Sequence, residues 1–237
     1  MIYAGILAGG VGSRMGMTGM PKQFLSVGGK PIIMHTVEKF LLCSRIDHIY
    51  VAVVGEYVSH MTDILRKEIG DCNRVTVIAG GSDRNGSIVN IISAIRQNDS
   101  SPDSILITHD AVRPFVSARI IDENIDAAME CGATDTVIPA TDTIIHSSDG
   151  VCLDDIPVRS ELYNGQTPQT FRISLFEEDY FSLSDEQKKI LTDACKIFIL
   201  AGRTVKIVKG DSYNMKITTP FDLRLAEAIV AEELNND

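Results

Sequence analysis

The chain opens with the apolar run Ile2–Leu7 and continues directly into Ala8-Gly9-Gly10-Val11-Gly12-Ser13-Arg14-Met15-Gly16, followed by Met20-Pro21-Lys22-Gln23-Phe24-Leu25. The apolar run predicts a buried strand. The glycines after it predict a loop whose backbone N–H groups turn inward, because no Cβ obstructs them. Two cations, Arg14 and Lys22, stand eight residues apart in and after this loop. Amides that face inward and two fixed cations indicate a site for a polyphosphate.

Two common glycine-rich motifs do not fit this loop. The dinucleotide-binding pattern G-x-G-x-x-G places an acidic residue about 20 positions further on, whereas Gly10, Gly12 and Gly16 have one residue too many and cations follow them. The P-loop pattern requires a lysine directly after its last glycine, and Met17 stands there. A plain surface turn is the remaining alternative, and the two cations argue against it.

The composition limits the possible ligands. The chain has 237 residues, which suits one large α/β domain spanning residues 1–237. Its formal net charge of −10 argues against nucleic acid as a partner, since proteins that bind nucleic acid carry a basic face. An anionic ligand must therefore be held by cations gathered locally.

The cysteines and the apolar runs indicate a cytoplasmic protein. The five cysteines are scattered without a C-x-x-C pair, which is typical of reduced thiols in the cytosol. The N-terminus lacks the basic region of a signal peptide. No stretch approaches the roughly 18 apolar residues of a membrane span, so we expect no membrane partner.

Apolar runs alternate with segments of helical period along most of the chain. This alternation predicts an α/β fold: a Rossmann-like, mostly parallel sheet with helices on both faces. The expected strands are Ile2–Leu7, His48–Val54, Arg74–Ile78, Ser104–Thr108, Asp135–Ala140 and Thr204–Val208. The expected helices begin at Pro31, Tyr57, Ser87, Ser117, Leu175, Asp193 and Pro220, the last with Thr219 and Asp222 as a capping box.

Residues 141–165 differ in character from the rest. Three short apolar runs, Thr143–Ile145, Val151–Cys152-Leu153 and Ile156–Val158, are broken by the turn signal Ser147-Ser148-Asp149-Gly150. The segment has too little apolar content to fold alone. We therefore predict a projecting β-arm, after which the chain returns through Gln166–Phe171 to the next helix.

Ligands of open α/β sheets bind beyond the carboxyl ends of the strands, and the segments expected there are polar. Gly80–Ser87 follows the third strand, Asp110 and Arg113 follow the fourth, and Thr141-Asp142-Thr143 follows the fifth. One cleft could gather six cations there: Arg14, Lys22, Arg84, Arg113, Arg159 and Lys216.

Each of these residues also has a plainer interpretation. Arg84 could cap loop carbonyls, Arg113 could be a structural partner of Asp110, and Arg159 could be a solvated surface residue. Asp110, at the end of a strand, is of the kind that holds Mg²⁺ in phosphate sites. His109 has no second ligand at metal spacing and is interpreted as a hydrogen-bonded core residue.

The motifs in this order resemble the sugar-phosphate cytidylyltransferases, the relatives of 2-C-methyl-D-erythritol 4-phosphate cytidylyltransferase. The resemblance rests on the opening stretch and on Gly80–Arg84, His109–Pro114, Gln166–Gln169 and Lys216–Thr218, and it covers essentially the whole chain. Further stretches look more like the ribitol-5-phosphate subgroup, which serves teichoic acid synthesis: Met1–Leu7, Tyr163–Gln166 and Leu191–Lys196. Ala111 departs from that subgroup, whose members often carry a serine there.

The resemblance implies the transfer of CMP from CTP to D-ribitol 5-phosphate in a homodimer joined by the arm. Methylerythritol phosphate is the alternative acceptor, and a non-catalytic nucleotide-binding regulator and a dehydrogenase are more distant alternatives. The implied nucleotide-binding residues are Leu7, Ala8, Gly9, Gly10, Gly80, Gly81, Ser82, Asp83, Arg84, Asn85, Gly86, Ser87 and Ala111. The implied catalytic residues are Arg14, Lys22, Arg159 and Lys216. The implied substrate-binding residues are Arg113, Asp142, Thr143, Arg159, Thr192 and Lys216, and Asp110 is the implied ligand of Mg²⁺.

Overall fold

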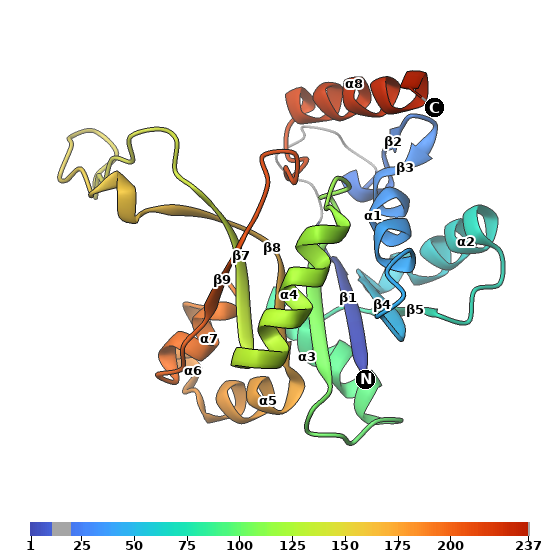
Figure 1. Cartoon of the computed structure of the whole chain (residues 1–237), viewed down its shortest axis with the longest axis horizontal. Coiled ribbons are helices and arrows are strands. Elements are labelled where there is room, and N and C mark those ends of the chain that lie inside the picture. The colour runs from blue at the N-terminus through green and yellow to red at the C-terminus, as the bar shows by residue number, and fades with distance from the viewer. Residues whose placement is uncertain (11–19, 237) are drawn as a thin grey trace.

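Seven strands form one sheet in the computed structural model, which describes residues 1–10 and 20–236 (Figure 1). Within this sheet, as far as these residues describe it, β8 alone runs against its neighbours: it pairs antiparallel with β6 and β7, and the other pairs of the sheet are parallel. The mostly parallel sheet confirms the predicted α/β class. In spatial order its strands are β5 (Val75–Ala79), β4 (His48–Val53), β1 (Ile2–Ala8), β6 (Ile105–Asp110), β8 (Tyr163–Arg172), β7 (Ala133–Pro139) and β9 (Lys206–Lys209).

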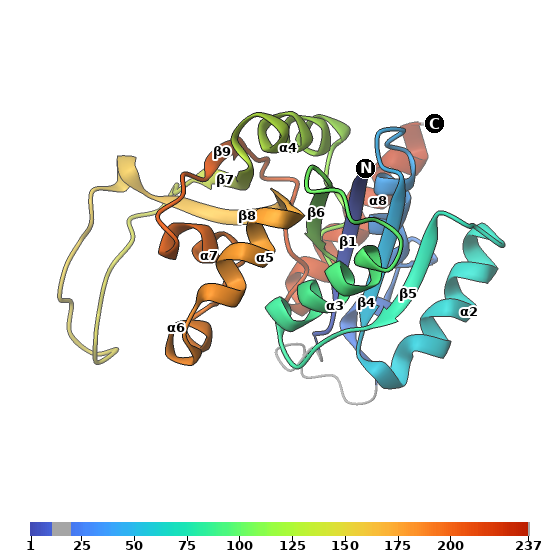
Figure 2. The same cartoon turned by 90° about the horizontal axis from the view of Figure 1, so that it is seen from below.

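Helices cover both faces of the sheet, because the central strands are apolar in both directions. Every residue of β6 is buried, as is every residue of β4 after His48. One core contains Phe40, Met61 and Ile125, and the other contains Ile91 and Phe176. Figure 2 shows α4 on one side of β8 and α5 and α7 on the other. The first core is built by α1 (Ile32–Leu41), α2 (Val58–Ile69) and α4 (Ala118–Cys131), and the second by α3 (Arg84–Arg96), α5 (Ile173–Ser182) and α7 (Cys195–Leu200), with α6 (Asp185–Lys189) between the last two.

The central strand β8 was not predicted, because its sequence Tyr-Asn-Gly-Gln-Thr-Pro-Gln-Thr-Phe-Arg is polar and contains a proline. Three of its buried polar side chains, those of Gln166, Thr167 and Gln169, form hydrogen bonds to other segments. Gln169 pairs with Thr108 of β6 and with Asp135 of β7. The register then shifts, since Val137 pairs with Gly165. Pro168 lies in the skipped stretch, where a missing backbone donor does not break the ladder.

The arm projects from the sheet as predicted, but it is not built of strands (Figures 1 and 2). Between β7 and β8 the backbone forms one isolated bridge, between His146 and Asp155. The three short apolar runs that predicted strands stay exposed, and the 3-10 turn η4 (Arg159–Glu161) precedes β8. A strand pair needs a hydrophobic face to be stable by itself, and the apolar side chains of the arm are exposed in the part of the chain that the structure describes.

The C-terminal helix α8 (Pro220–Asn236) begins as predicted. The Thr219 hydroxyl accepts a hydrogen bond from the backbone N–H of Asp222, and the Asp222 carboxylate accepts one from the N–H of Thr219. The helix lies beside the hairpin of β2 (Ser26–Val27) and β3 (Lys30–Pro31), with Val230 in the small core that it shares with Val27. Among the described residues, no helix combines the length and the apolar character that crossing a membrane requires.

Candidate active site

The site lies where the direction of the chain across the sheet reverses. From β1 the chain proceeds outward to β4 and β5, and it then returns past β1 to form β6. Leu7 of β1 pairs with Asp110 of β6 at the carboxyl end of both strands. A crevice opens at such a switch point in α/β sheets, because the loops that leave the two strands diverge.

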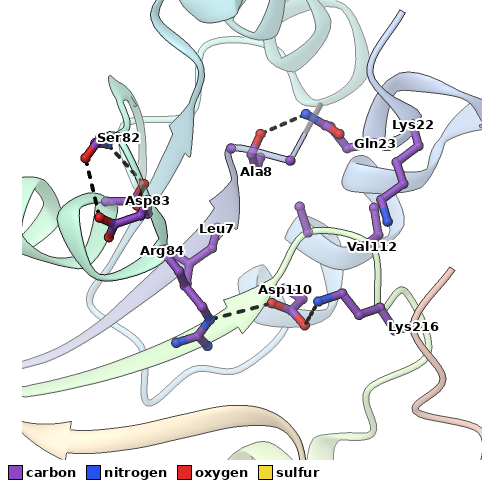
Figure 3. Close-up of a pocket in the computed structure, with 15 residues that line it drawn as sticks. Leu7, Ala8, Lys22, Gln23, Ser82, Asp83, Arg84, Asp110, Val112 and Lys216 are labelled. Carbon is purple, nitrogen blue, oxygen red and sulfur yellow. Dashed lines mark hydrogen bonds and ion pairs between the residues drawn. The ribbon is translucent and has the colours of Figure 1, made fainter. Parts of the chain in front are cut away.

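A cavity of about 340 Å³ occupies this crevice (Figure 3). It gathers thirteen of the residues that the sequence predicted for the site and two more, Gln23 and Val112. The thirteen are Leu7, Ala8, Gly9, Gly10, Lys22, Gly81, Ser82, Asp83, Arg84, Ser87, Asp110, Ala111 and Lys216. The predicted nucleotide loop, the two lysines and the carboxylate at the end of β6 therefore line one common cavity.

The first turn of α3 forms one wall of the cavity. Asp83 is its N-cap: the carboxylate accepts a hydrogen bond from the N–H of Gly86. The expected start of this helix at Ser87 is wrong, since the helix begins at Arg84; Ser87 lies within it, and its hydroxyl accepts from the N–H of Gly81. Only glycine fits at Gly81, where a Cβ would lie 2.4 Å from the carbonyl carbon of Gly86. The positive end of a helix dipole thus faces the cavity, which favours an anion.

Asp110 is the electrostatic centre of the site. Its Oδ2 lies 3.0 Å from Nζ of Lys216 and 3.2 Å from Nε of Arg113, and its Oδ1 lies 4.0 Å from Nε of Arg84. Burial by itself would raise the pKa of the Asp110 carboxyl. The three cations outweigh burial and hold this pKa well below its usual range.

Arg113 lies behind this carboxylate and does not line the cavity. Its Nη1 donates to the backbone carbonyl of Asn214 at 2.7 Å, and its Nε donates to Asp110. The side chain is 10% exposed. This geometry favours the structural interpretation of Arg113, as the partner of Asp110, over the role in substrate binding.

His109 is a hydrogen-bonded core residue, as predicted. The Thr167 hydroxyl accepts from the N–H of Asp110 and bonds to Nδ1 of His109, and Nε2–H of the ring donates to the carbonyl of Arg113. With the proton on Nε2, Nδ1 of the neutral ring accepts from the Thr167 hydroxyl. Burial, as the main cause, lowers the pKa of His109 to about 4.

Several predicted residues do not reach the cavity. Gly80, Asn85 and Gly86 belong to the loop and first turn of α3 but do not line it. Thr192 is exposed before α7, and Asp142, Thr143 and Arg159 are exposed on the arm. Arg159 donates to the carbonyl of Thr141 there. Arg14 lies outside the described residues, so its role stays a prediction.

A second polar cluster lies outside the cavity, on the sheet face covered by α3 and α7. Gln169 donates from Nε2 to Asp135 at 3.0 Å and to Asp193 at 2.5 Å, and Asp193 accepts from the N–H of Cys195. Asp193 is therefore the residue at the start of a helix that the sequence suggested. Burial, followed by the charge of Asp193, raises the pKa of Asp135 to about 6.

The cavity suits a nucleoside triphosphate and a second phosphate. Lys22, Arg84 and Lys216 line it against two carboxylates, and one of these, Asp83, is engaged as a helix cap. A chain with a net charge of −10 thus presents positive charge at this place. Glycine amides, a helix N-terminus and three cations around one cavity are typical of an α/β protein that binds a nucleotide through its phosphates.

The chain belongs to the family of 2-C-methyl-D-erythritol 4-phosphate cytidylyltransferase, IspD, whose model matches residues 2–232. The solved enzyme from Anaerococcus prevotii is similar over 97% of this chain and 96% of that one, with 28% identity and a TM-score of 0.78. The enzyme from Thermus thermophilus has 27% identity over 98% and 100% of the two chains and a TM-score of 0.75. The enzyme from Francisella tularensis has 25% identity over 96% and 98%, with a TM-score of 0.80.

The acidic cluster predicts a pH-dependent stability. Between pH ~4 and ~6 the folded state keeps a proton on Asp135 that the unfolded chain, with an ordinary pKa of about 3.9, has released. The contribution of Asp135 to the free energy of unfolding therefore falls as the pH rises through this window, whereas that of His109, whose pKa is lowered by burial, rises. Asp135→Asn keeps the acceptor for Gln169 and removes the charge. We expect it to raise the free energy of unfolding at pH 7 by ~1–2 kcal/mol, a value reduced for partial exposure.

Urea unfolding of the wild type and Asp135→Asn at pH 4, 5, 6 and 7 measures this effect. Asp71→Asn, on a fully exposed side chain, is the matched control and should follow the wild type. Identical pH profiles for the wild type and Asp135→Asn would contradict the raised pKa.

Proposed function

We propose that this cytidylyltransferase uses D-ribitol 5-phosphate as its acceptor and gives CDP-ribitol and pyrophosphate. The observation that carries the transfer step is the cavity itself, in which Lys22 and Lys216 flank the glycine loop and Asp110. The choice of acceptor is supported by the sequence, since Tyr163–Gln166 and Leu191–Lys196 look like the ribitol-5-phosphate subgroup.

In the proposed reaction an oxygen of the acceptor phosphate attacks the α-phosphorus of CTP. A new P–O bond forms, the bond between the α-phosphorus and its bridging oxygen breaks, and pyrophosphate leaves with the electron pair. The second pKa of a phosphate monoester is about 6, so the nucleophile is anionic at neutral pH and needs no general base. The protein's task is to position the two phosphates and to neutralise charge.

The cations of the site have distinct tasks in this scheme. Lys22 and, as the sequence predicts, Arg14 stabilise the charge that develops at the α-phosphorus and on the leaving pyrophosphate. Lys216 binds the acceptor phosphate, for which it exchanges its contact with Asp110. Arg84 keeps the Asp110 carboxylate compensated during that exchange, because it is a separate cation on Oδ1.

The residues around Asp110 fit a magnesium ion. Mg²⁺ is commonly bound through one or two carboxylates, with substrate phosphates and water as its further ligands. Oδ2 of Asp110 already meets Lys216 and Arg113, whereas Oδ1 has Arg84 at 4.0 Å and retains capacity to coordinate. Asp110 would hold the ion, which when bound supplies charge neutralisation to the triphosphate.

The second candidate acceptor is 2-C-methyl-D-erythritol 4-phosphate. It is favoured by the family model and by the solved structures, which are enzymes of that substrate. Both acceptors are phosphate monoesters of a short polyol, so the same cations would hold them.

Pyrophosphate release with CTP and each acceptor in turn tests the proposed function. We expect kcat/KM to be highest with D-ribitol 5-phosphate. Higher kcat/KM with the methylerythritol phosphate would assign the chain to the second candidate. CTP binding without pyrophosphate release with either acceptor would indicate a nucleotide-binding regulator.

A homodimer would complete the site. The arm exposes apolar side chains, among them Val151 (87% exposed) and Val158 (62%), that need a partner surface. Arg159, on the same arm, is exposed and lies outside the cavity of its own chain. We infer that the arm packs on a second copy and brings Arg159 to the partner's acceptor phosphate.

Lys22→Ala and Lys216→Ala should fail in different ways. Lys22 acts on charge that develops in the transition state, so its loss should lower kcat by about 100-fold or more. Lys216 holds the acceptor in the ground state as well, so its loss should raise KM for the acceptor much more than KM for CTP. Steady-state pyrophosphate release measures both, and the exposed Lys67→Ala is the control. A lower CTP affinity in Lys216→Ala would place this lysine at the nucleotide instead.

Chelation should abolish turnover if Asp110 holds Mg²⁺. We expect EDTA to stop pyrophosphate release and an excess of Mg²⁺ to restore it, because the triphosphate otherwise adds four negative charges beside a carboxylate. Asp110→Asn should require a higher Mg²⁺ concentration for half-maximal rate. Full activity of a metal-free preparation would show that Asp110 is purely structural.

Mixed dimers test whether the site is shared. Co-expression of Lys22→Ala with Arg159→Ala, each inactive alone, places both lesions in one site of the mixed dimer and none in the other. With random pairing, half the dimers regain one site of two, which is about a quarter of the wild-type activity. Confirmed heterodimers that remain inactive would show that Arg159 serves its own subunit.

A further inference from the structure

Gln23 joins two segments of the cavity lining that stand fifteen residues apart in the sequence. Its Nε2 donates a hydrogen bond to the carbonyl of Ala8 at 2.7 Å (Figure 3). Ala8 ends β1 and begins the glycine loop, and Gln23 lies in the 3-10 turn η2 (Lys22–Phe24). The side chain is 2% exposed, so this amide is sequestered from bulk water.

The turn that carries Gln23 is fixed from its other side. Phe24 is buried, with its ring 4.9 Å from the ring of His60 and 5.5 Å from that of Tyr57. Backbone N–H groups of Phe24 and Leu25 donate to the carbonyls of Pro21 and Lys22. The turn therefore has two anchors: an aromatic contact to the α2 side and the Gln23 amide to β1.

Lys22 is the neighbour of Gln23 on this turn, and Ala8, Gly9 and Gly10 line the cavity opposite. The Gln23–Ala8 bond thus sets the position of a catalytic cation relative to the glycine loop. A shift of about 1 Å in such a group can cost 100-fold in rate. Burial makes the bond specific, because an unpaired buried carbonyl or amide is costly.

We propose that Gln23 is a positioning residue that holds Lys22 and the floor of the nucleotide site as one unit. The proposal rests on the proposed transfer of CMP from CTP. Gln23 acts through Lys22 and Ala8, whereas the acceptor phosphate is assigned to Lys216, which contacts Asp110 and not Gln23. Its loss should therefore change kcat and CTP affinity while leaving KM for the acceptor in place.

Gln23→Glu tests the donor with almost no change of shape. An ionised carboxylate presents an acceptor to the Ala8 carbonyl and repels it, whereas a protonated carboxyl can donate the lost hydrogen bond. At pH 8 we expect kcat to fall about tenfold or more. The ratio of kcat of Gln23→Glu to kcat of the wild type should rise several-fold as the pH is lowered from 8 to 6. Protonation of the introduced carboxyl restores the hydrogen bond to Ala8.

Two further variants separate positioning from simple packing. Gln23→Met keeps the length of the side chain but has no hydrogen-bond donor. Its kcat relative to that of the wild type should therefore stay low and should not change with pH. Gln97→Glu, on an exposed glutamine, should match the wild type throughout. Normalising to the wild type at each pH cancels the titration of the surrounding groups, which are Lys22, Asp83, Arg84, Asp110 and Lys216 in the cavity, His35 and Glu38 on α1, and His60 on α2.

Calorimetric titration with CTP at pH 8 and pH 6 gives a readout that needs no turnover. Gln23→Glu should bind CTP more weakly than the wild type at pH 8 and recover at pH 6. Three results would each overturn the proposal. The first is wild-type kcat and CTP affinity in both Gln23 variants, the second is equal pH profiles of the Glu and Met variants, and the third is an effect confined to KM for the acceptor. A wild type that binds CTP but turns over neither acceptor would refute the proposed function alone, and the titration would still decide the role of Gln23.

Discussion

The site depends on one buried carboxylate that must stay charged. Asp110 ends β6 in the interior of an acidic chain, where an isolated charge would be expensive to bury. Three cations from three different segments compensate it: Arg84 from the start of α3, Arg113 from the turn after β6, and Lys216 from the segment before α8. One carboxylate thus fixes the mutual position of the elements that form the cavity.

The polar strand β8 stabilises the segments around Asp110 through hydrogen bonds. Its Thr167 hydroxyl accepts from the N–H of Asp110, and its Thr167 carbonyl accepts from the buried side chain of Asn214. Asn214 in turn offers its own carbonyl to Arg113. The polar side chain of Thr167 is therefore explained by the loop that it holds, and an apolar residue in its place would leave the N–H of Asp110 without this acceptor.

Those parts of the fold that follow from local pattern could be predicted from the sequence. The buried strands β1, β4 and β6 are apolar runs, and Asp110 and Gly81 were found because they follow such runs directly. β8 was not predicted as a strand, because the partners of its polar residues are non-local and its proline lies at a register shift. Gln23 was not predicted as a site residue for a similar reason. Its hydrogen bond reaches a carbonyl fifteen residues earlier in the chain, and no spacing rule predicts such a contact. The neighbouring motif residue Lys22 was the only local sign.

Because Asp110 contacts three cations, one of them can leave it to bind a phosphate. Lys216 is the most exposed of the three, with 40% of its side chain accessible, against 24% for Arg84 and 10% for Arg113. In the proposed reaction an entering phosphate competes with Asp110 for the exposed lysine, while the two arginines remain on the carboxylate. This exchange would leave no buried charge unpaired, which would keep its free-energy cost low. A site with Lys216 as the sole partner of Asp110 would have to expose a bare carboxylate to the incoming anion, and the mutual repulsion would oppose binding.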